Sequence, residues 1–366
     1  MEKTRTVRNP WTVVLLIVAV CIAIALGIAA ISHSAGNKDG LGTYEAINIV
    51  NMQDIQATPN GFVYYDGNTV SAINSDGKVA WSYVVGPDAG FDASKYGVAV
   101  WSGKTITMID IDDGSTMFNG TMAQDVISAR IGDKYTAAVI GELSNSIIVI
   151  MENSGSQVNQ IAKEAATVID YGFFANGSLF WTMLCDSNGT VPSCDIETYR
   201  PGKEIVGSIK DTEQLAYAVM FQSAEICVAG DTYIKTYDYS GAEMEAKRKL
   251  VYGWYLAHSD DNSADPLMAF VNDAQRKGDS AIQDVRLIRS DLDRVVHLPF
   301  GCRDVVCRGD TIYGFSSSGH LVIMNAFADT AQTYQLELGI DEVYGVTKDG
   351  VAVVSSMGNI CLVDLE

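Results

Sequence analysis

The sequence predicts an all-β fold: a single β-propeller of about eight four-stranded blades, preceded by one transmembrane helix. Three observations predict this fold. One uncharged apolar run lies near the N-terminus, short β-branched and aromatic runs separated by turn residues fill the rest of the chain, and these runs recur about every 40 residues. Seven blades are the alternative, because two of the repeats are irregular.

The first element is the apolar run at residues 11–31, WTVVLLIVAVCIAIALGIAAI, which has 21 residues and no charge. At about 1.5 Å per residue, a helix of this length spans a hydrocarbon core of about 30 Å. Lys3, Arg5 and Arg8 precede it, which predicts a single-pass cell-membrane protein with a cytoplasmic N-terminus. A cleaved signal peptide is the alternative, but its apolar region is normally shorter, at about 7–15 residues, so the length favours an uncleaved signal anchor.

The chain is therefore divided into four parts, of which the last is the domain. Residues 1–10 form a cytoplasmic stub and residues 11–31 the anchor. Residues 32–44 contain several Gly and Ser residues, which predicts a linker. Residues 45–366 form the predicted extracytoplasmic propeller. The formal net charge of the whole chain is −20, and a field of that sign repels nucleic acid, so nucleic acid is excluded as a partner. Solubility is the simplest explanation of the acidity.

The clearest repeat is residues 61–85, GFVYYDGNTVSAINSDGKVAWSYVV, in which Asp66-Gly67 and Asp76-Gly77 turns join three strands. Seven further units have a similar layout, so that one residue marks the second strand of each unit: Val70, Ile106, Ile147, Ile196, Tyr233, Val285, Leu321 and Ile360. The spacings between these residues are 36, 41, 49, 37, 52, 36 and 39. A period near 40 with several strands per unit indicates a β-propeller, because a single small sheet cannot bury both of its apolar faces.

The ends of the chain support a closed ring. The last unit stops at Glu366 after its third strand, and an unassigned strand, residues 45–52 (EAINIVNM), precedes the first unit. If this strand pairs as the outermost strand of the last blade, the ring closes and no sheet edge is left unpaired there.

The segment YYDGNTVSAINSDGKVAWSY, residues 64–83, resembles the repeat of quinoprotein-type (PQQ-like) propellers. The chain is also similar to the outer-membrane assembly propeller and to uncharacterised single-pass, membrane-anchored propellers of Gram-positive bacteria. The resemblance implies fold and not chemistry. A quinone enzyme of this family is expected to have a vicinal Cys-Cys pair and calcium ligands, and the sequence has no adjacent cysteines. We therefore expect no cofactor.

No motif in the sequence predicts catalytic, cofactor-binding or metal-ligating residues. Three segments with some likeness to such motifs are expected to be hairpin turns: Ser102–Thr105 (SGKT), Ser75–Lys78 (SDGK) and Asp110–Gly114 (DIDDG). Each histidine lacks a His or Cys neighbour at metal-ligand spacing, and His258 lies in a polar loop where a site has no further support.

Cys185 and Cys194 flank the loop DSNGTVPS and form a candidate disulfide in an extracytoplasmic domain. Cys302 and Cys307 lie five residues apart on what is predicted to be one strand. Their side chains would then face opposite sides of the sheet, so they are not expected to pair with each other.

These observations favour a non-enzymatic binding or scaffold propeller, anchored in the membrane, that contacts an unknown protein or cell-envelope ligand. The alternative is an extracytoplasmic hydrolase or lyase with acidic residues at the mouth of the propeller channel, because loops of all blades converge on one axis. Buried carboxylates or histidines with shifted pKa values at the channel mouth would favour the enzyme.

Overall fold

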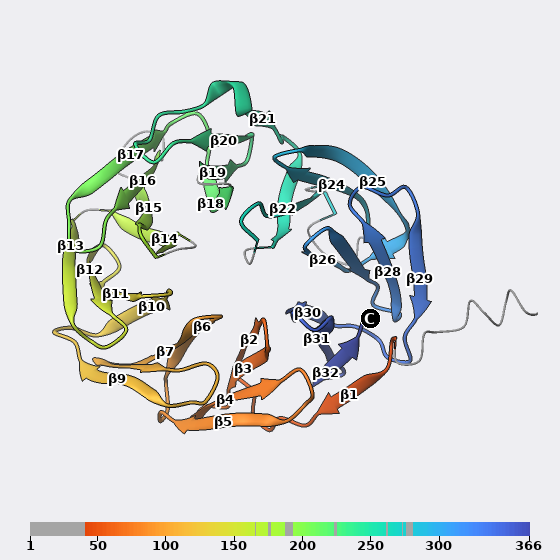
Figure 1. Ribbon diagram of the computed structural model, residues 1–366, viewed down its shortest axis with the longest axis horizontal. Coiled ribbons are helices and arrows are strands. Elements are labelled where there is room, and N and C mark those ends of the chain that lie inside the picture. Colours follow the sequence, from red (N-terminus) through yellow and green to blue (C-terminus); the bar gives the residue numbers. More distant parts are fainter. Residues whose placement is uncertain are drawn as a thin grey trace, which may run out of the picture.

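Eight four-stranded antiparallel sheets are arranged radially around a central axis in the computed structural model (Figure 1). The structure describes residues 41–366 except residues 165, 175–176, 187–192, 223–224, 261–262, 273 and 276–280. The predicted all-β propeller with eight blades is therefore confirmed, and the seven-blade alternative is wrong.

Each blade runs from its innermost to its outermost strand in chain order, except the last, in which the outermost strand is β1. Blades 1 to 4 consist of β2 (Asp54–Thr58), β3 (Gly61–Tyr65), β4 (Thr69–Asn74) and β5 (Val79–Val84); β6 (Gly90–Ser94), β7 (Gly97–Ser102), β8 (Thr105–Ile109) and β9 (Thr116–Thr121); β10 (Val126–Ile131), β11 (Tyr135–Glu142), β12 (Asn145–Glu152) and β13 (Gln157–Glu164); and β14 (Thr167–Phe173), β15 (Phe180–Asp186), β16 (Ser193–Tyr199) and β17 (Ile205–Asp211).

Blades 5 to 8 consist of β18 (Ala216–Gln222), β19 (Glu225–Gly230), β20 (Tyr233–Tyr237) and β21 (Lys249–Leu250); β22 (Trp254–Ser259), β23 (Met268–Asn272), β24 (Ile282–Arg289) and β25 (Leu292–Cys302); β26 (Asp304–Arg308), β27 (Thr311–Phe315), β28 (His320–Asn325) and β29 (Ala331–Gln335); and β30 (Glu342–Val346), β31 (Val351–Ser356), β32 (Asn359–Asp364) and β1 (Tyr44–Ile47). A 3-10 helix, η1 (Glu245–Lys247), precedes β21.

The eight residues that mark the repeat occupy equivalent strands, one in each blade. They lie in the third strand from the axis and not in the second, as the strands β4, β8, β12, β16, β20, β24, β28 and β32 show. The prediction missed the innermost strands of most units. Strands such as β6 (GFDAS) are short and contain Gly and Asp, which are depleted in strands, so their sequences resemble turns.

The first and last strands of the ring pair with each other, as predicted. Strand β1 runs antiparallel to β32, with Tyr44 opposite Val363 and Ile47 opposite Ile360. The strand is shorter than the predicted span of 45–52, and the residues that follow it connect the outer wall to the innermost strand of blade 1. The C-terminal strand of blade 8 is thus covered on its outer edge, which closes the ring without leaving that edge exposed.

The hydrophobic core consists of clusters between neighbouring blades. Each of eight clusters of buried side chains in the described part of the chain combines residues of two adjacent blades, and one of them joins Phe62 and Ile73 of blade 1 to Val353 and Leu362 of blade 8. The middle strands therefore bury both faces, as β4 shows, whereas Trp81 is the one buried residue of the outer strand β5. This explains why apolar runs mark the middle strands in the sequence.

Within a blade, Asp-Gly turns form the hairpins as the sequence predicts. In the turn between β3 and β4 the Asp66 carboxylate accepts hydrogen bonds from the backbone N–H groups of Asn68 and Thr69, at 2.9 and 2.7 Å. Gly67 has a φ of 96°, which a side chain would disfavour. The segments Ser102–Thr105, Ser75–Lys78 and Asp110–Gly114 are likewise turns between strands of one blade, as expected.

The predicted membrane anchor at residues 11–31 lies outside the described residues. In the part of the chain that the structure describes, no helix has the length and apolar character needed to cross a bilayer. The description begins at Leu41, which is buried, and the backbone N–H of Gly42 donates to the carbonyl of Asp364 at 2.7 Å. The chain therefore contacts the last blade a few residues before β1 begins.

Candidate binding site at the channel mouth

Two adjoining cavities lie at one end of the central channel. We call this end the mouth: it is the end at which turns join the first and second strands of each blade. The first cavity has a volume of about 1020 Å³ and is lined by blades 8, 1, 2, 6 and 7. The second has a volume of about 730 Å³ and is lined by blades 2 to 6. Both include Ser94, Lys95, Tyr96, Ser259 and Ser263, so all eight blades contribute to one concave surface.

In four of the innermost strands a polar side chain occupies an equivalent position. It lies two residues before the first residue of the pair that closes the hairpin between the first and second strands of the blade. The four residues are Gln56, Asp92, Arg130 and His258. Each hydrogen bonds to the main chain of the next blade. Gln56 accepts from the N–H of Ala93 at 2.8 Å, and Asp92 accepts from the N–H of Ile131 at 3.1 Å.

Between blades 3 and 4 the equivalent residue is Arg130, and between blades 6 and 7 it is His258. Arg130 donates to the carbonyl of Tyr171 at 2.8 Å, and Nδ1 of His258 accepts from the N–H of Cys307 at 3.3 Å. We refer to Gln56, Asp92, Arg130 and His258 as the inner belt. Adjacent innermost strands are not joined into one continuous sheet, and the belt supplies hydrogen bonds between them.

Charged groups meet in the second cavity, where Asp92, Arg130 and Asp170 come from three successive blades. Arg130 forms an ion pair with Asp170 at 2.9 Å. Burial raises the pKa of the Asp92 carboxyl, and the nearby Arg130 offsets part of that rise. Burial also raises the pKa of the Tyr171 phenol, whose hydroxyl lies 2.8 Å from that of Ser128. A carboxyl whose pKa lies above its usual value therefore lies beside an ion pair on the channel wall.

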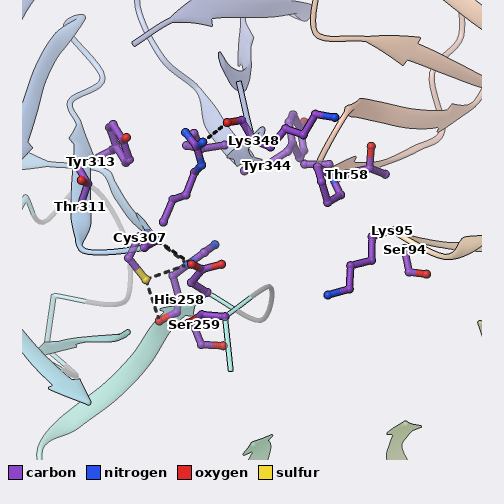
Figure 2. Close-up of a pocket in the computed structure, with 18 of the residues that line it drawn as sticks. Thr58, Ser94, Lys95, His258, Ser259, Cys307, Thr311, Tyr313, Tyr344 and Lys348 are labelled. Atoms are coloured by element: carbon purple, nitrogen blue, oxygen red, sulfur yellow. Dashed lines mark hydrogen bonds between the residues drawn. The ribbon is translucent and has the colours of Figure 1, made fainter. Parts of the chain in front are cut away.

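His258 and Cys307 face the first cavity and lie on different blades (Figure 2). Nδ1 of His258 lies 3.3 Å from the Sγ of Cys307, and the thiol donates to the carbonyl of Leu267 at 3.0 Å. The contact joins residues 49 positions apart in the sequence, so spacing alone could not find it. The His258 imidazole also accepts a hydrogen bond from the backbone N–H of Cys307, so these two residues join blade 6 to blade 7.

The prediction that Cys302 and Cys307 share one strand is wrong. Cys302 ends β25, the outermost strand of blade 6, and Cys307 lies on β26, the innermost strand of blade 7. Arg303 separates the two strands, so the chain passes from the outer wall to the channel between the two cysteines. Both side chains are buried in the same hydrophobic cluster between blades 6 and 7.

Cys185 and Cys194 are directly opposite each other on the paired strands β15 and β16. Cross-strand neighbours have Cα atoms about 4.5–5.5 Å apart, within the range that a disulfide needs. Both are thiols in the structure, and burial raises the pKa of Cys194. The disulfide stays a prediction. The residues between them, 187–192, are outside the described part of the chain.

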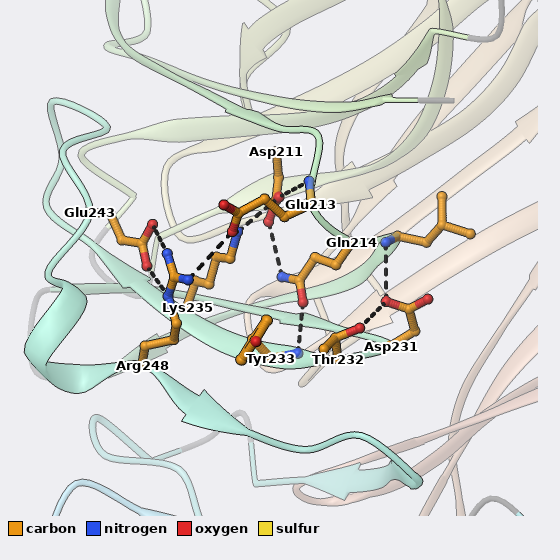
Figure 3. Close-up of polar contacts among 10 residues, drawn as sticks. Asp211, Glu213, Gln214, Asp231, Thr232, Tyr233, Lys235, Glu243 and Arg248 are labelled. Carbon is orange, nitrogen blue, oxygen red and sulfur yellow. Dashed lines mark hydrogen bonds and ion pairs between the residues drawn. The ribbon is translucent and has the colours of Figure 1, made fainter. Parts of the chain in front are cut away.

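A second charged cluster lies between blades 4 and 5, around the connection from β17 to β18 and strand β20 (Figure 3). The buried Lys235 forms ion pairs with the buried Asp211 at 2.9 Å and with Glu213 at 2.7 Å. Burial alone would lower the pKa of Lys235, but the hydrogen bonds to the two carboxylates outweigh it and raise that pKa. Arg248 holds Glu243 through two hydrogen bonds and extends the cluster to η1. The cluster contributes to the packing of the blade junction and does not line either cavity.

No His, Cys, Asp or Glu triplet placed to hold a metal ion is found among the described residues. The sequence analysis did not identify the four residues of the inner belt as a group. The signal that could have found them is their equivalent position before the first hairpin of a blade.

Together these features define a β-propeller with a polar, concave channel mouth. No family model matches the sequence. No curated protein matches it significantly. Among solved structures, the chain is similar to Sqt1 of Saccharomyces cerevisiae, with a TM-score of 0.58, 10% identity, and coverage of 89% of this chain and 98% of that one.

It is also similar to the computationally designed protein Ika8, with a TM-score of 0.58, 11% identity, and coverage of 88% of this chain and 98% of that one. For BamB from Moraxella catarrhalis the TM-score is 0.54 and the identity 12%, over 88% of this chain and 98% of that one. At these identities the likeness shows a shared propeller fold and nothing further.

Proposed function

We propose that this protein is a membrane-anchored, extracytoplasmic binding or scaffold propeller that holds a protein or cell-envelope ligand at the channel mouth. The observation that carries the proposal is that turns from all eight blades meet in two adjoining cavities at one end of the ring. Sites of this kind, formed by loops on a rigid β framework, are typical binding surfaces. The repeat in residues 64–83 supports placing the chain among quinoprotein-type propellers without a quinone cofactor.

The apolar run of residues 11–31 supports the anchor. Its topology is tested by protease treatment of intact cells that express the full chain. An extracytoplasmic domain is degraded or shed from intact cells, whereas a domain inside the cytoplasm stays protected until the membrane is permeabilised.

The binding role is tested by a photo-crosslinking amino acid placed either at Tyr96, in both cavities, or at Val84, which is exposed on the outer strand β5. A ligand held at the mouth crosslinks from position 96 and not from position 84. Crosslinks that form equally from both positions, or from neither, would contradict the proposal.

A hydrolase or lyase is the second candidate, and one observation favours it. Asp92 lies in the second cavity with a raised pKa, as a general acid requires, beside Asp170. However, the Asp92 carboxylate accepts the N–H of Ile131 and Asp170 is paired with Arg130. Incubation of envelope polysaccharides with the full chain and with Asp92→Asn tests this candidate: cleavage products that disappear in the variant would replace the binding role with an enzymatic one.

A further inference from the structure

The first cavity has a charge balance opposite to that of the whole chain. The sequence has 45 acidic and 25 basic residues. The charged side chains that line the cavity are three basic ones and two acidic ones: Lys95, Arg308, Lys348, Asp260 and Glu366. Basic side chains therefore outnumber acidic ones in this cavity although the whole chain is strongly acidic, and a concave surface with low-dielectric walls concentrates the field of such charges.

Both acidic side chains are engaged by the protein itself. Asp260 is 8% exposed and accepts a hydrogen bond from the backbone N–H of Gly309 at 2.7 Å. Glu366 accepts from Arg308 at 3.2 Å, and Arg308 also donates to the carbonyl of Lys348. Arg308 is thus held by contacts with the chain, and the remaining positive charge of the cavity comes from the two lysines.

Lys95 and Lys348 are both exposed, and within the described residues neither forms an ion pair. Lys95 belongs to the turn between β6 and β7, and its amine lies 5.2 Å from the centre of the Tyr96 ring. Lys348 belongs to the equivalent turn of blade 8. Figure 2 shows the two lysines on different sides of the opening, with Thr58 of blade 1 nearby, and Lys95 pointing toward its centre. Two cationic side chains thus reach one hollow from blades on either side of blade 1.

We propose that the first cavity binds an anionic ligand through a phosphate or carboxylate group that Lys95 and Lys348 contact. This inference rests on the proposed binding role of the mouth and adds the chemistry that it recognises. Lys is a point charge with three donors, which suits a phosphate or carboxylate that approaches from the channel axis. Hydrogen bonds between charged partners are about twice as strong as neutral ones, so each lysine makes a measurable contribution.

The proposal is tested by calorimetric titration of the full chain, purified in detergent, with pyrophosphate, with citrate and with uncharged sucrose. We expect pyrophosphate or citrate to bind and sucrose not to bind, and the better anion tells whether the natural group is a phosphate or a carboxylate. Lys95→Gln and Lys348→Gln should each weaken binding about tenfold, in line with the loss of one charge-assisted hydrogen bond. Lys95→Arg should retain most of the affinity because it keeps the charge.

Lys104→Gln is the matched control, since Lys104 is an exposed lysine on the turn between β7 and β8 at the opposite end of the ring. The Lys104→Gln variant should bind the anion with the same affinity as the unmodified chain. Affinity that is unchanged in both mouth variants, or the absence of binding by both anions, overturns the proposal. If crosslinks from position 96 persist in that case, the mouth is still the binding surface and only its anion preference is wrong.

Discussion

The carboxylate of Asp92 accepts a hydrogen bond from the main-chain N–H of Ile131 at 3.1 Å and so joins the innermost strand of blade 2 to that of blade 3. Gln56, Arg130 and His258 form equivalent contacts at three other junctions. Propeller blades are usually described as joined by apolar packing between their faces. In this chain the innermost strands add polar contacts to four of these junctions.

Asp92 should make the stability of the propeller depend on pH. Burial raises the pKa of its carboxyl above the usual value of 3.8, so the folded chain holds the proton more tightly than the unfolded chain. This contribution is fully present below the unfolded pKa and is lost as the pH rises through the folded pKa. We expect the unfolding free energy of the unmodified chain to fall, relative to Asp92→Asn, as urea titrations move from pH 4 to pH 7.

Asp76→Asn is the control for this experiment. Asp76 is exposed, and a hydrogen bond from Lys78 lowers the pKa of its carboxyl. The difference between the unmodified chain and this variant should change with pH in the opposite sense and by a small amount, because exposed ion pairs contribute little. If the difference in unfolding free energy between the unmodified chain and Asp92→Asn does not change with pH, the Asp92 carboxyl has the same pKa in the folded and unfolded chains.

Lys235→Met should destabilise the junction between blades 4 and 5 by about 3–5 kcal/mol, because it leaves the buried Asp211 carboxylate without its cation. The double variant Lys235→Met, Asp211→Leu should recover most of that loss, since no buried charge then remains unpaired. Urea unfolding measures both. A double variant as unstable as the single one would mean that Lys235 acts through its packing and not through its charge.

Ring closure by β1 should be visible in a pair of truncations. A chain that begins at residue 41 keeps the β1–β32 ladder, whereas one that begins at residue 52 loses it and exposes the edge of β32. We expect the shorter chain to melt at a lower temperature and to associate through the exposed edge, as seen by size-exclusion chromatography. Equal melting temperatures would show that β1 contributes nothing to closure.

Cys185 and Cys194 should form a disulfide when the domain is exported, because they are directly opposite on paired strands. The closed loop of about ten residues predicts a stabilisation of about 2–3 kcal/mol in the chain-entropy model. Mass spectrometry of the thiol-alkylated chain, before and after reduction, counts the protected cysteines. Cys185→Ser should leave Cys194 open to alkylation after partial unfolding, and full alkylation without reductant would exclude the bond.

Much of the fold could be predicted from the sequence because the third strand of each blade is buried on both faces. Val70 and Ile106, for example, are fully buried and lie in the short strands TVSAIN and TITMI, which are rich in β-branched residues, so the repeat can be recognised in the sequence. The innermost strands could not be predicted in the same way. In β6 an aspartate in the centre of the strand faces the channel, and local propensity favours a turn.

The candidate site was less accessible to sequence reasoning, for a different physical reason. Lys95 and Lys348 are separated by most of the chain and become neighbours of one cavity only when blade 8 closes against blade 1. The contact between His258 and Cys307 likewise depends on the packing of two blades. Neither set has a local motif, because the chemistry of a propeller mouth is assembled from one turn per blade.

The pairing of Tyr44 with Val363 also has a consequence for how the molecule is made. During synthesis β1 emerges before every other strand of the ring and its partner β32 emerges after all of them, so blade 8 stays incomplete until β32 has been translated. Until then the edge of the nascent first strand is available to other chains, and such long-range pairing is slow to form. The ring can therefore close only after the strands of all eight blades have been made.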